Sequence, residues 1–159
     1  MKRLTIPIAL LALMAAPAAF AGTISKATVE RVSADKVIVR WSDSDPVDVF
    51  QSDRPDATVA EAAPVSAKDG DGSYEAASAS RSGRLFFLLR DSRTGNLLRV
   101  AERVLPLDQG SNFRDIGGYA TRDGRHVRWG MIYRTGGQAM LTDLDVKRLQ
   151  SLRIANLVD

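Results

Sequence analysis

Asn112-Phe113-Arg114-Asp115-Ile116-Gly117-Gly118-Tyr119 divides this chain into two regions of different character. The stretch combines an amide, two opposite charges, two adjacent glycines and two aromatic rings. Because glycine has no Cβ, it adopts backbone angles that other residues avoid and lets other groups approach the main chain closely. The stretch therefore predicts a tightly held segment in which Arg114 and Asp115 occupy fixed positions.

The residues that follow predict a hairpin and then a strand. Arg122-Asp123-Gly124-Arg125 lies between two short segments, residues 119–121 and 126–129, and Asp-Gly in such a place is a strong hairpin signal. Gly130 interrupts the pattern, and residues 131–135 form the next predicted strand.

A helix is predicted over residues 143–152. Thr142 is a favourable N-cap, and Asp145 occupies the position three residues later where a capping-box acid belongs. Its apolar face is expected to carry Leu141, Leu144, Leu149 and Leu152. The apolar residues 154–159 follow as a strand, so the order strand, helix, strand indicates a parallel sheet and the first part of an α/β domain.

Residues 22–107 predict an all-β sandwich, because short strand-like segments are separated by turn residues without helical periodicity. The apolar run at 85–89 is typical of a strand covered on both faces, and one weak strand is expected between residues 53 and 72. Residues 33–50 resemble the second and third strands of fibronectin type III or related immunoglobulin-like domains, with Trp41 in the core. A polar segment beginning at residue 108 marks the predicted domain boundary.

The amino terminus has the pattern of a secretory signal peptide, residues 1–21. Lys2 and Arg3 precede an apolar run, and Ala19-Phe20-Ala21 is a small-x-small cleavage pattern. We expect an exported, periplasmic protein that starts near Gly22 and keeps no stable membrane anchor after cleavage.

The charge and the cysteine and histidine content exclude several classes of function. The net charge of +3 includes Lys2 and Arg3, and without them the chain is almost neutral, so no nucleic-acid partner is expected. The chain contains no cysteine, and hence neither a disulfide framework nor a thiol nucleophile. His126, the single histidine, has no other metal-type ligand near it in sequence and is predicted to be a surface residue; no metal or other cofactor is expected.

The motif at 111–119, followed by Asp123-Gly124, by Gly130-Met131-Ile132-Tyr133-Arg134-Thr135 and by a helix leading into 154–159, resembles the amino-terminal third of bacterial tyrosine phosphatases of the dual-specificity-like group. The resemblance implies that residues 108–159 are an incomplete phosphatase-like α/β domain. In that family a later loop carries a cysteine thiolate that attacks phosphorus. A phosphorylated protein or a phospholipid-like molecule would be the substrate.

The resemblance also suggests roles for particular residues. Arg114 would contact phosphate through its guanidinium fork or would orient the phosphate loop, and Arg134 is a second candidate for such a contact. Alternatively, Arg114 and Asp115 form a structural ion pair, or Asp115 pairs with another arginine. Asp159 is a weak general-acid candidate whose alternative role is to tether a loop. Structural roles are expected for Asn112, Gly117 and Gly118.

The sequence therefore predicts an exported, tyrosine-phosphatase-like hydrolase of phosphate monoesters, whose 159 residues are inactive alone because they lack the catalytic cysteine. The alternative is a non-enzymatic periplasmic binding module built on the β-sandwich.

Overall fold

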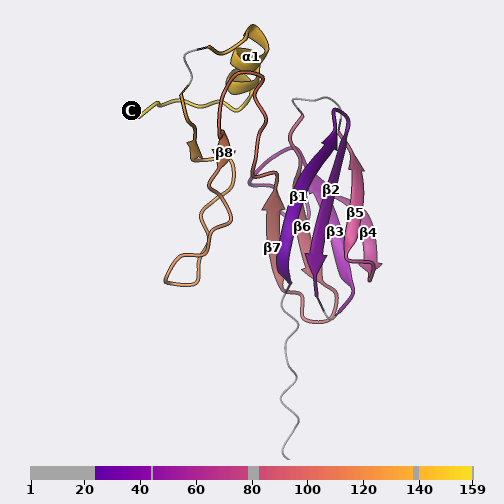
Figure 1. Ribbon diagram of the computed structural model, residues 1–159. Coiled ribbons are helices and arrows are strands. Elements are labelled where there is room, and N and C mark those ends of the chain that lie inside the picture. Colours follow the sequence, from indigo (N-terminus) through magenta and orange to yellow (C-terminus); the bar gives the residue numbers. More distant parts are fainter. Residues whose placement is uncertain (1–23, 44, 79–82, 138–139, 159) are drawn as a thin grey trace, which may run out of the picture.

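The computed structural model describes residues 24–43, 45–78, 83–137 and 140–158. Strands dominate the chain, and the described part has one short α-helix near its carboxyl end. Figure 1 shows strands β1 to β7 gathered in one body, with β8 and α1 on the β7 side of it. The predicted signal peptide lies outside the described residues.

The first sheet contains β1 (Ser25–Ser33), β2 (Lys36–Ser42) and β5 (Ser73–Ala77), in the order β1-β2-β5. Both pairings are antiparallel. β2 lies within residues 33–50, for which strands were predicted, whereas β5 was not predicted. Its small and polar residues give little strand signal, and it forms because β2 offers it an edge.

The second sheet contains β3 (Val47–Ser52), β4 (Ala63–Asp69), β6 (Phe86–Asp91) and β7 (Leu97–Ala101), in the order β4-β3-β6-β7. All of its pairings are antiparallel. β4 is the weak strand expected between residues 53 and 72, and it lies at the edge of the sheet, where its Pro64 is tolerated.

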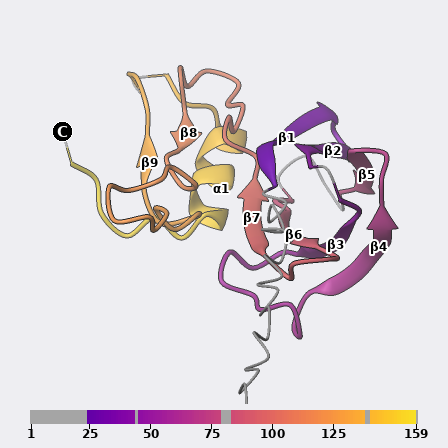
Figure 2. The same ribbon diagram turned by 90° about the horizontal axis from the view of Figure 1, so that it is seen from below.

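The two sheets share one hydrophobic core. In β2 every second residue is buried, and these residues are Val37, Val39 and Trp41. In β6 four consecutive apolar residues are buried, as expected for a strand covered on both faces. Figure 2 shows the two sheets facing each other. The predicted core position of Trp41 is confirmed, since only 7% of its surface is exposed.

The chain after the sandwich folds as a small antiparallel unit. Residues Arg114–Asp115 form β8 and pair with Tyr133–Arg134, which form β9. The predicted hairpin is present between them, since Thr121 N–H donates to the Arg125 carbonyl over 2.8 Å. β9 is shorter than the predicted strand.

The helix α1 spans Asp143–Ser151 and has the predicted capping box at Thr142 and Asp145. The predicted apolar face is wrong in part, because Leu144 is 65% exposed and the buried residue of the helix is Asp145. Within the described residues, no helix is long and apolar enough to cross a membrane.

The strand predicted at 154–159 is not seen over the described residues 154–158, which form no strand and are exposed. The βαβ unit and its parallel sheet are therefore absent from the described part of the chain, where every strand pairing is antiparallel. Arg153 turns the backbone after the helix at φ +53°, and nothing in the described chain pairs with the apolar residues beyond it.

Candidate functional site

The motif of residues 112–119 lies between the end of the sandwich and β9. Leu105 N–H donates to the Phe113 carbonyl over 3.1 Å, and Asp115 N–H donates to the Arg103 carbonyl over 2.9 Å. On its other side β8 pairs with β9. Main-chain hydrogen bonds thus hold β8 from both sides, which gives its two side chains fixed directions.

The register of this small ladder brings together two of the predicted site residues. Arg114 lies directly opposite Arg134, and Asp115 lies directly opposite Tyr133. Opposite residues of an antiparallel pair project on the same face, and successive residues project on opposite faces. One face therefore carries two guanidinium groups, and the other carries a carboxylate and a phenol.

The arginine face has unmet hydrogen-bonding capacity. Arg114 Nη2 donates to Asn112 Oδ1, while Arg114 Nε is buried and has no hydrogen-bond partner among the described residues. Arg134 is exposed. Because like charges directly opposite each other are destabilising and an unpaired buried donor is costly, this face is suited to an anionic group.

Asn112 supports this face through its backbone. Its φ is +58°, a left-handed conformation that asparagine adopts more readily than most residues. The turn lets the Asn112 side-chain oxygen reach the guanidinium two residues later. Asn112 is thus the one residue described as accepting a hydrogen bond from the Arg114 side chain.

The opposite face buries Asp115 completely. Its carboxylate accepts hydrogen bonds from Arg84 Nη2 at 2.5 Å and from the N–H groups of Gly117 and Gly130, each at 2.7 Å. Three donors with excellent geometry satisfy a buried charge. Asp115 therefore pairs with an arginine of the sandwich and not with Arg114.

Arg84 connects the motif to the sandwich. Besides Asp115, it donates to the Glu102 carbonyl at 2.9 Å and to the Tyr133 hydroxyl at 3.0 Å, and its guanidinium lies 4.7 Å from the centre of the Phe86 ring. The Arg84 side chain is only 8% exposed. This set of contacts holds β9 and β8 to the start of β6.

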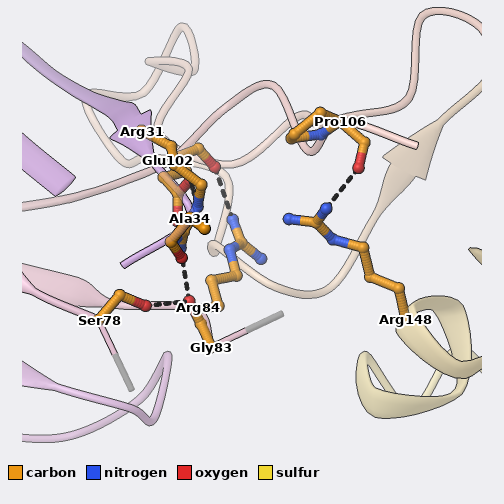
Figure 3. A network of polar contacts seen from close by, with 8 residues as sticks. All are labelled: Arg31, Ala34, Ser78, Gly83, Arg84, Glu102, Pro106 and Arg148. Carbon is orange, nitrogen blue, oxygen red and sulfur yellow. Dashed lines mark hydrogen bonds and ion pairs between the residues drawn. The ribbon is translucent and has the colours of Figure 1, made fainter. Parts of the chain in front are cut away.

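A second buried ion pair lies next to Arg84 (Figure 3). Arg31 from β1 binds the Glu102 carboxylate through two hydrogen bonds, each of 2.9 Å. Farther along, Arg148 from α1 donates to the Pro106 carbonyl. Polar contacts therefore tie the residues between β7 and β8 both to the first sheet and to the helix.

Two aromatic rings of this unit stack on each other. Phe113 and Tyr133 stack with their centres 5.4 Å apart and their planes 13° apart. Burial raises the pKa of the Tyr133 hydroxyl, an effect that the nearby Arg84 charge opposes. Tyr133 is thus a protonated phenol at neutral pH and accepts a hydrogen bond from Arg84.

The paired glycines make room for Trp129. A Cβ on Gly117 would lie 2.5 Å from Trp129 Cα, and Gly118, at φ +77°, faces the ring of the same tryptophan. Trp129 belongs to the hydrophobic core of the sandwich, where 6% of its surface is exposed. The two glycines therefore have a structural role, as predicted: the absence of a Cβ at each position lets the indole of Trp129 pack against the main chain.

Sequence reasoning missed Arg84, Tyr133 and Trp129 as parts of this site. Arg84 lies 31 positions before its carboxylate partner, and no local pattern indicates such a contact. The available signal for Tyr133 and Trp129 was the aromatic content of the stretch 113–133, which holds Phe113, Tyr119, Trp129 and Tyr133. Asp159, the weak general-acid candidate, lies outside the described residues, and His126 is exposed, as predicted.

One acidic cluster occurs elsewhere in the described chain. Asp43, Asp45 and Asp91 place carboxylate oxygens within 4.8 Å of one another at the loops of the sandwich. Arg93 Nη2 lies 2.7 Å from Asp45, so a guanidinium already supplies positive charge to this cluster. The cluster shares no residue with β8 or β9.

Comparison with known proteins identifies the class of the carboxy-terminal segment. Residues 105–159 match the tyrosine phosphatase family. This segment begins at Leu105, a buried residue after β7, and includes the whole β8–β9 ladder and α1. The arginine pair and the buried Asp115 therefore lie in the segment that matches the tyrosine phosphatase family.

A protein of Cupriavidus necator, whose name assigns it to the tyrosine-protein phosphatases, is 46% identical to this chain over 55 residues. The matching segment is 35% of this chain and 20% of that protein, so the chain spans about one fifth of the length of its curated relative. No solved structure matches the chain.

Proposed function

We propose that the protein takes part in the hydrolysis of phosphate monoesters through a domain of the tyrosine phosphatase type, and that Arg114 and Arg134 form a phosphate-contacting pair. The observation that supports this proposal is the register of β8 and β9, which places the two arginines opposite each other in the family-matched segment. The unpartnered Nε of Arg114 adds a donor that an anion would satisfy.

The chemistry of the pair suits a phosphoryl group. Guanidinium groups bind phosphate oxygens through two parallel hydrogen bonds and stay charged at every physiological pH. They also stabilise the negative charge of a transferring phosphoryl group. Phosphotyrosine or a phosphoinositide-like molecule is the proposed substrate class.

The described role of these residues does not include the nucleophile of the reaction. The 159 residues contain no cysteine, so they supply no thiolate. We therefore assign to these residues the binding and positioning of phosphate, and a cysteine-phosphate intermediate would require a thiol from outside them. The structural carboxylate Asp115, already saturated by three donors, is not assigned an acid or base role.

Phosphate binding by the 159-residue chain tests the proposal. In a titration with inorganic phosphate, the Nε–H resonance of Arg114 is expected to shift, and Arg134→Gln should weaken that response. Arg122→Gln is the matched control, because Arg122 is an exposed arginine in the hairpin turn of the same segment. An Arg114 resonance that ignores phosphate, or that responds equally in Arg134→Gln and wild type, contradicts the proposal.

Hydrolysis is tested separately. The purified chain is expected to hydrolyse para-nitrophenyl phosphate no faster than buffer, because no thiolate nucleophile is present. Turnover that persists after removal of contaminating phosphatases would show that another group in these residues attacks phosphorus.

We also propose export to the periplasm, on the basis of the signal-peptide pattern in residues 1–21. Expression in a Gram-negative host should yield a periplasmic protein whose intact mass corresponds to a start at Gly22. Ala21→Phe should leave the precursor uncleaved, because the cleavage pattern requires a small residue at this place. A mature protein that retains Lys2 and Arg3 would contradict this proposal.

The sandwich is proposed to be of the immunoglobulin-like class. Its three-stranded and four-stranded antiparallel sheets share one core that contains a tryptophan from its second strand. Such sandwiches share architecture without much sequence similarity, so the proposal rests on the arrangement of the strands and the core.

A further inference from the structure

Three carboxylates from two separate parts of the sandwich converge at its loops. Asp43 and Asp45 lie in the connection between β2 and β3, and Asp91 is the last residue of β6. One oxygen from each of the three side chains lies within 4.8 Å of the other two. Two oxygens that bind the same Ca²⁺ ion at about 2.3–2.6 Å lie at most about 5 Å apart, so these three can reach one ion.

Asp91 is the member of this cluster whose carboxylate is only half satisfied. The residue is completely buried. Its Oδ1 accepts hydrogen bonds from the N–H groups of Arg93 at 2.8 Å and Thr94 at 2.9 Å, whereas its Oδ2 is buried and has no hydrogen-bond partner among the described residues. A buried carboxylate oxygen without a partner is costly, and a cation bound beside it removes that cost.

The cluster carries an excess of negative charge. The N–H group of Thr94 holds the pKa of the Asp91 carboxyl below its ordinary 3.8 against the effect of burial, so Asp91 is ionised at neutral pH. Arg93 Nη2 lies 2.7 Å from Asp45, and the Arg93 side chain is 45% exposed. This guanidinium offsets one of the three negative charges, and the remainder attracts a further cation.

The main chain around the cluster is already held in place. Ser92 N–H donates to the Pro46 carbonyl over 2.9 Å, which joins the loop after β6 to the connection between β2 and β3. Asp91 N–H donates to the Asn96 carbonyl over 3.0 Å and closes the loop after β6. The carboxylates therefore need little rearrangement to bind an ion, and such preorganisation lowers the cost of binding.

The chemistry of the side chains selects the kind of cation. All three are carboxylates, and oxygen ligands without histidine or cysteine suit hard cations such as Ca²⁺ better than zinc or copper. Ca²⁺ accepts flexible coordination geometry, whereas Mg²⁺ requires a nearly ideal octahedron with shorter bonds and gives up its water reluctantly. Ligands from two loops therefore favour Ca²⁺.

We propose that Asp43, Asp45 and Asp91 bind a Ca²⁺ ion, with water completing its coordination shell. The Arg93 guanidinium gives up its contact with Asp45 when the ion binds. The ion joins the connection between the two sheets to the end of β6 and so stabilises the sandwich. This site lies outside residues 105–159 and does not depend on the proposed function.

The experiment titrates the full 159-residue chain with CaCl₂ and follows thermal unfolding by circular dichroism. NaCl of equal ionic strength and MgCl₂ are the comparison salts. Extracellular calcium modules have dissociation constants of about 0.1–1 mM, so about 10 mM CaCl₂ should raise the unfolding midpoint by about 5 °C or more. MgCl₂ should raise it less, and NaCl least.

Variants measured by isothermal titration calorimetry assign the ligands. Asp91→Asn and Asp45→Asn should each weaken Ca²⁺ binding by about tenfold or more, because each removes a charged ligand. Asp45→Asn keeps the test decisive if the buried Asp91→Asn does not fold. Arg93→Gln should bind Ca²⁺ about threefold more tightly or better, because no guanidinium then competes for Asp45. Asp123→Asn is the control, since it removes the acid of an Asp–Arg pair outside the cluster.

A response to CaCl₂ no larger than the response to NaCl of equal ionic strength would overturn the proposal, and so would an equal response to MgCl₂. Wild-type affinity in both Asp91→Asn and Asp45→Asn would show that the ion binds elsewhere. Weaker binding by Arg93→Gln would also contradict the proposal, because the guanidinium would then support the ion instead of competing with it.

Discussion

Asp115 shows how a single carboxylate can serve structure in a motif that is dense in reactive side chains. It is completely buried, and all three of its donors come from fixed groups: one guanidinium and two glycine N–H groups. Within the described residues, Asp115 is the acid with which Arg84 forms an ion pair. Each of the two charges therefore depends on the other for compensation.

Asp115→Asn is expected to destabilise the protein strongly. Removal of one partner of a buried ion pair leaves an uncompensated charge, which typically costs about 3–5 kcal/mol. The free energy of unfolding can be measured in urea from tryptophan fluorescence. Asp123→Asn is the control, since Asp123 forms its ion pair with Arg125 in an exposed turn and its loss should matter little. Equal effects of the two substitutions would contradict a buried clamp.

Gly117→Ala tests the close approach of Trp129. A Cβ at this position would lie 2.5 Å from Trp129 Cα and 2.8 Å from its ring, so the substitution should cost about 1–3 kcal/mol through overpacking. Gly137→Ala is the control, because a Cβ there meets nothing within 4 Å. Thermal unfolding followed by circular dichroism compares them; equal midpoints for the two variants would rule out the steric role.

At the scale of elements, the first turn of α1 also anchors the loop that leaves the sandwich. Asp145 completes the capping box with Thr142 and accepts hydrogen bonds from the N–H groups of Asp108 at 2.6 Å and Gln109 at 3.0 Å. The acid at the helix start therefore has two functions: Oδ1 accepts from Asp108 in the loop, and Oδ2 accepts both from Gln109 in the loop and from the N–H group of Thr142 at the helix cap. This explains why a charged residue is the buried member of the helix.

The contribution of Asp145 should depend on pH. Burial alone would raise the pKa of its carboxyl, but the N–H groups of Asp108, Thr142 and Gln109 outweigh it and hold the pKa below its ordinary 3.8. A lowered folded-state pKa stabilises the fold above the unfolded-state value, and this stability is lost as the pH falls through the folded-state value.

Asp145→Asn should therefore be less stable than wild type at pH 7, and the difference should shrink as the pH falls below 3.8. Unfolding of both proteins in urea at several pH values measures it. Asp143→Asn, an exposed acid in the same turn, is the control for the helix dipole alone. A difference that grows toward low pH would contradict the assigned direction.

At the scale of the whole molecule, the sandwich and the phosphatase-family segment depend on each other for burial. Trp129 belongs to the sandwich core, and Asp115 is neutralised by Arg84 from the sandwich. Within the described segment, large apolar side chains such as Met140, Leu157 and Val158 are exposed. The segment thus has little core of its own.

Residues 105–159 expressed alone are expected to be poorly ordered or prone to aggregation, because they lose the partners of Trp129 and Asp115. Thermal unfolding and amide proton dispersion measure this against the full chain, which should unfold with the Trp129 signal and the sandwich signal together. A sharp cooperative transition of the isolated segment would show that it has an independent core.

The elements that could be predicted from the sequence are those set by interactions between residues close together in the chain. The alternation in β2, the continuous apolar run of β6, the Asp-Gly turn and the capping box all depend on residues a few positions apart. Arg114 and Arg134 were predicted as site residues from the motif. That they lie opposite each other follows from the register of β8 with β9. The strand expected at 154–159 does not form over the described residues 154–158, because a strand needs a paired neighbour, which local sequence does not supply.

The sequence by itself determined the β-strand character of residues 24–104, the hairpin, the helix start and the similarity of the carboxy-terminal segment to the tyrosine phosphatase family. Only the tertiary structure decided that Asp115 pairs with Arg84, that Trp129 enters the sandwich core, and that Asp145 holds a loop 36 positions away. The reason is physical: turns and caps are set by neighbouring residues, whereas a buried charge or ring takes whichever partner the folded chain brings within reach.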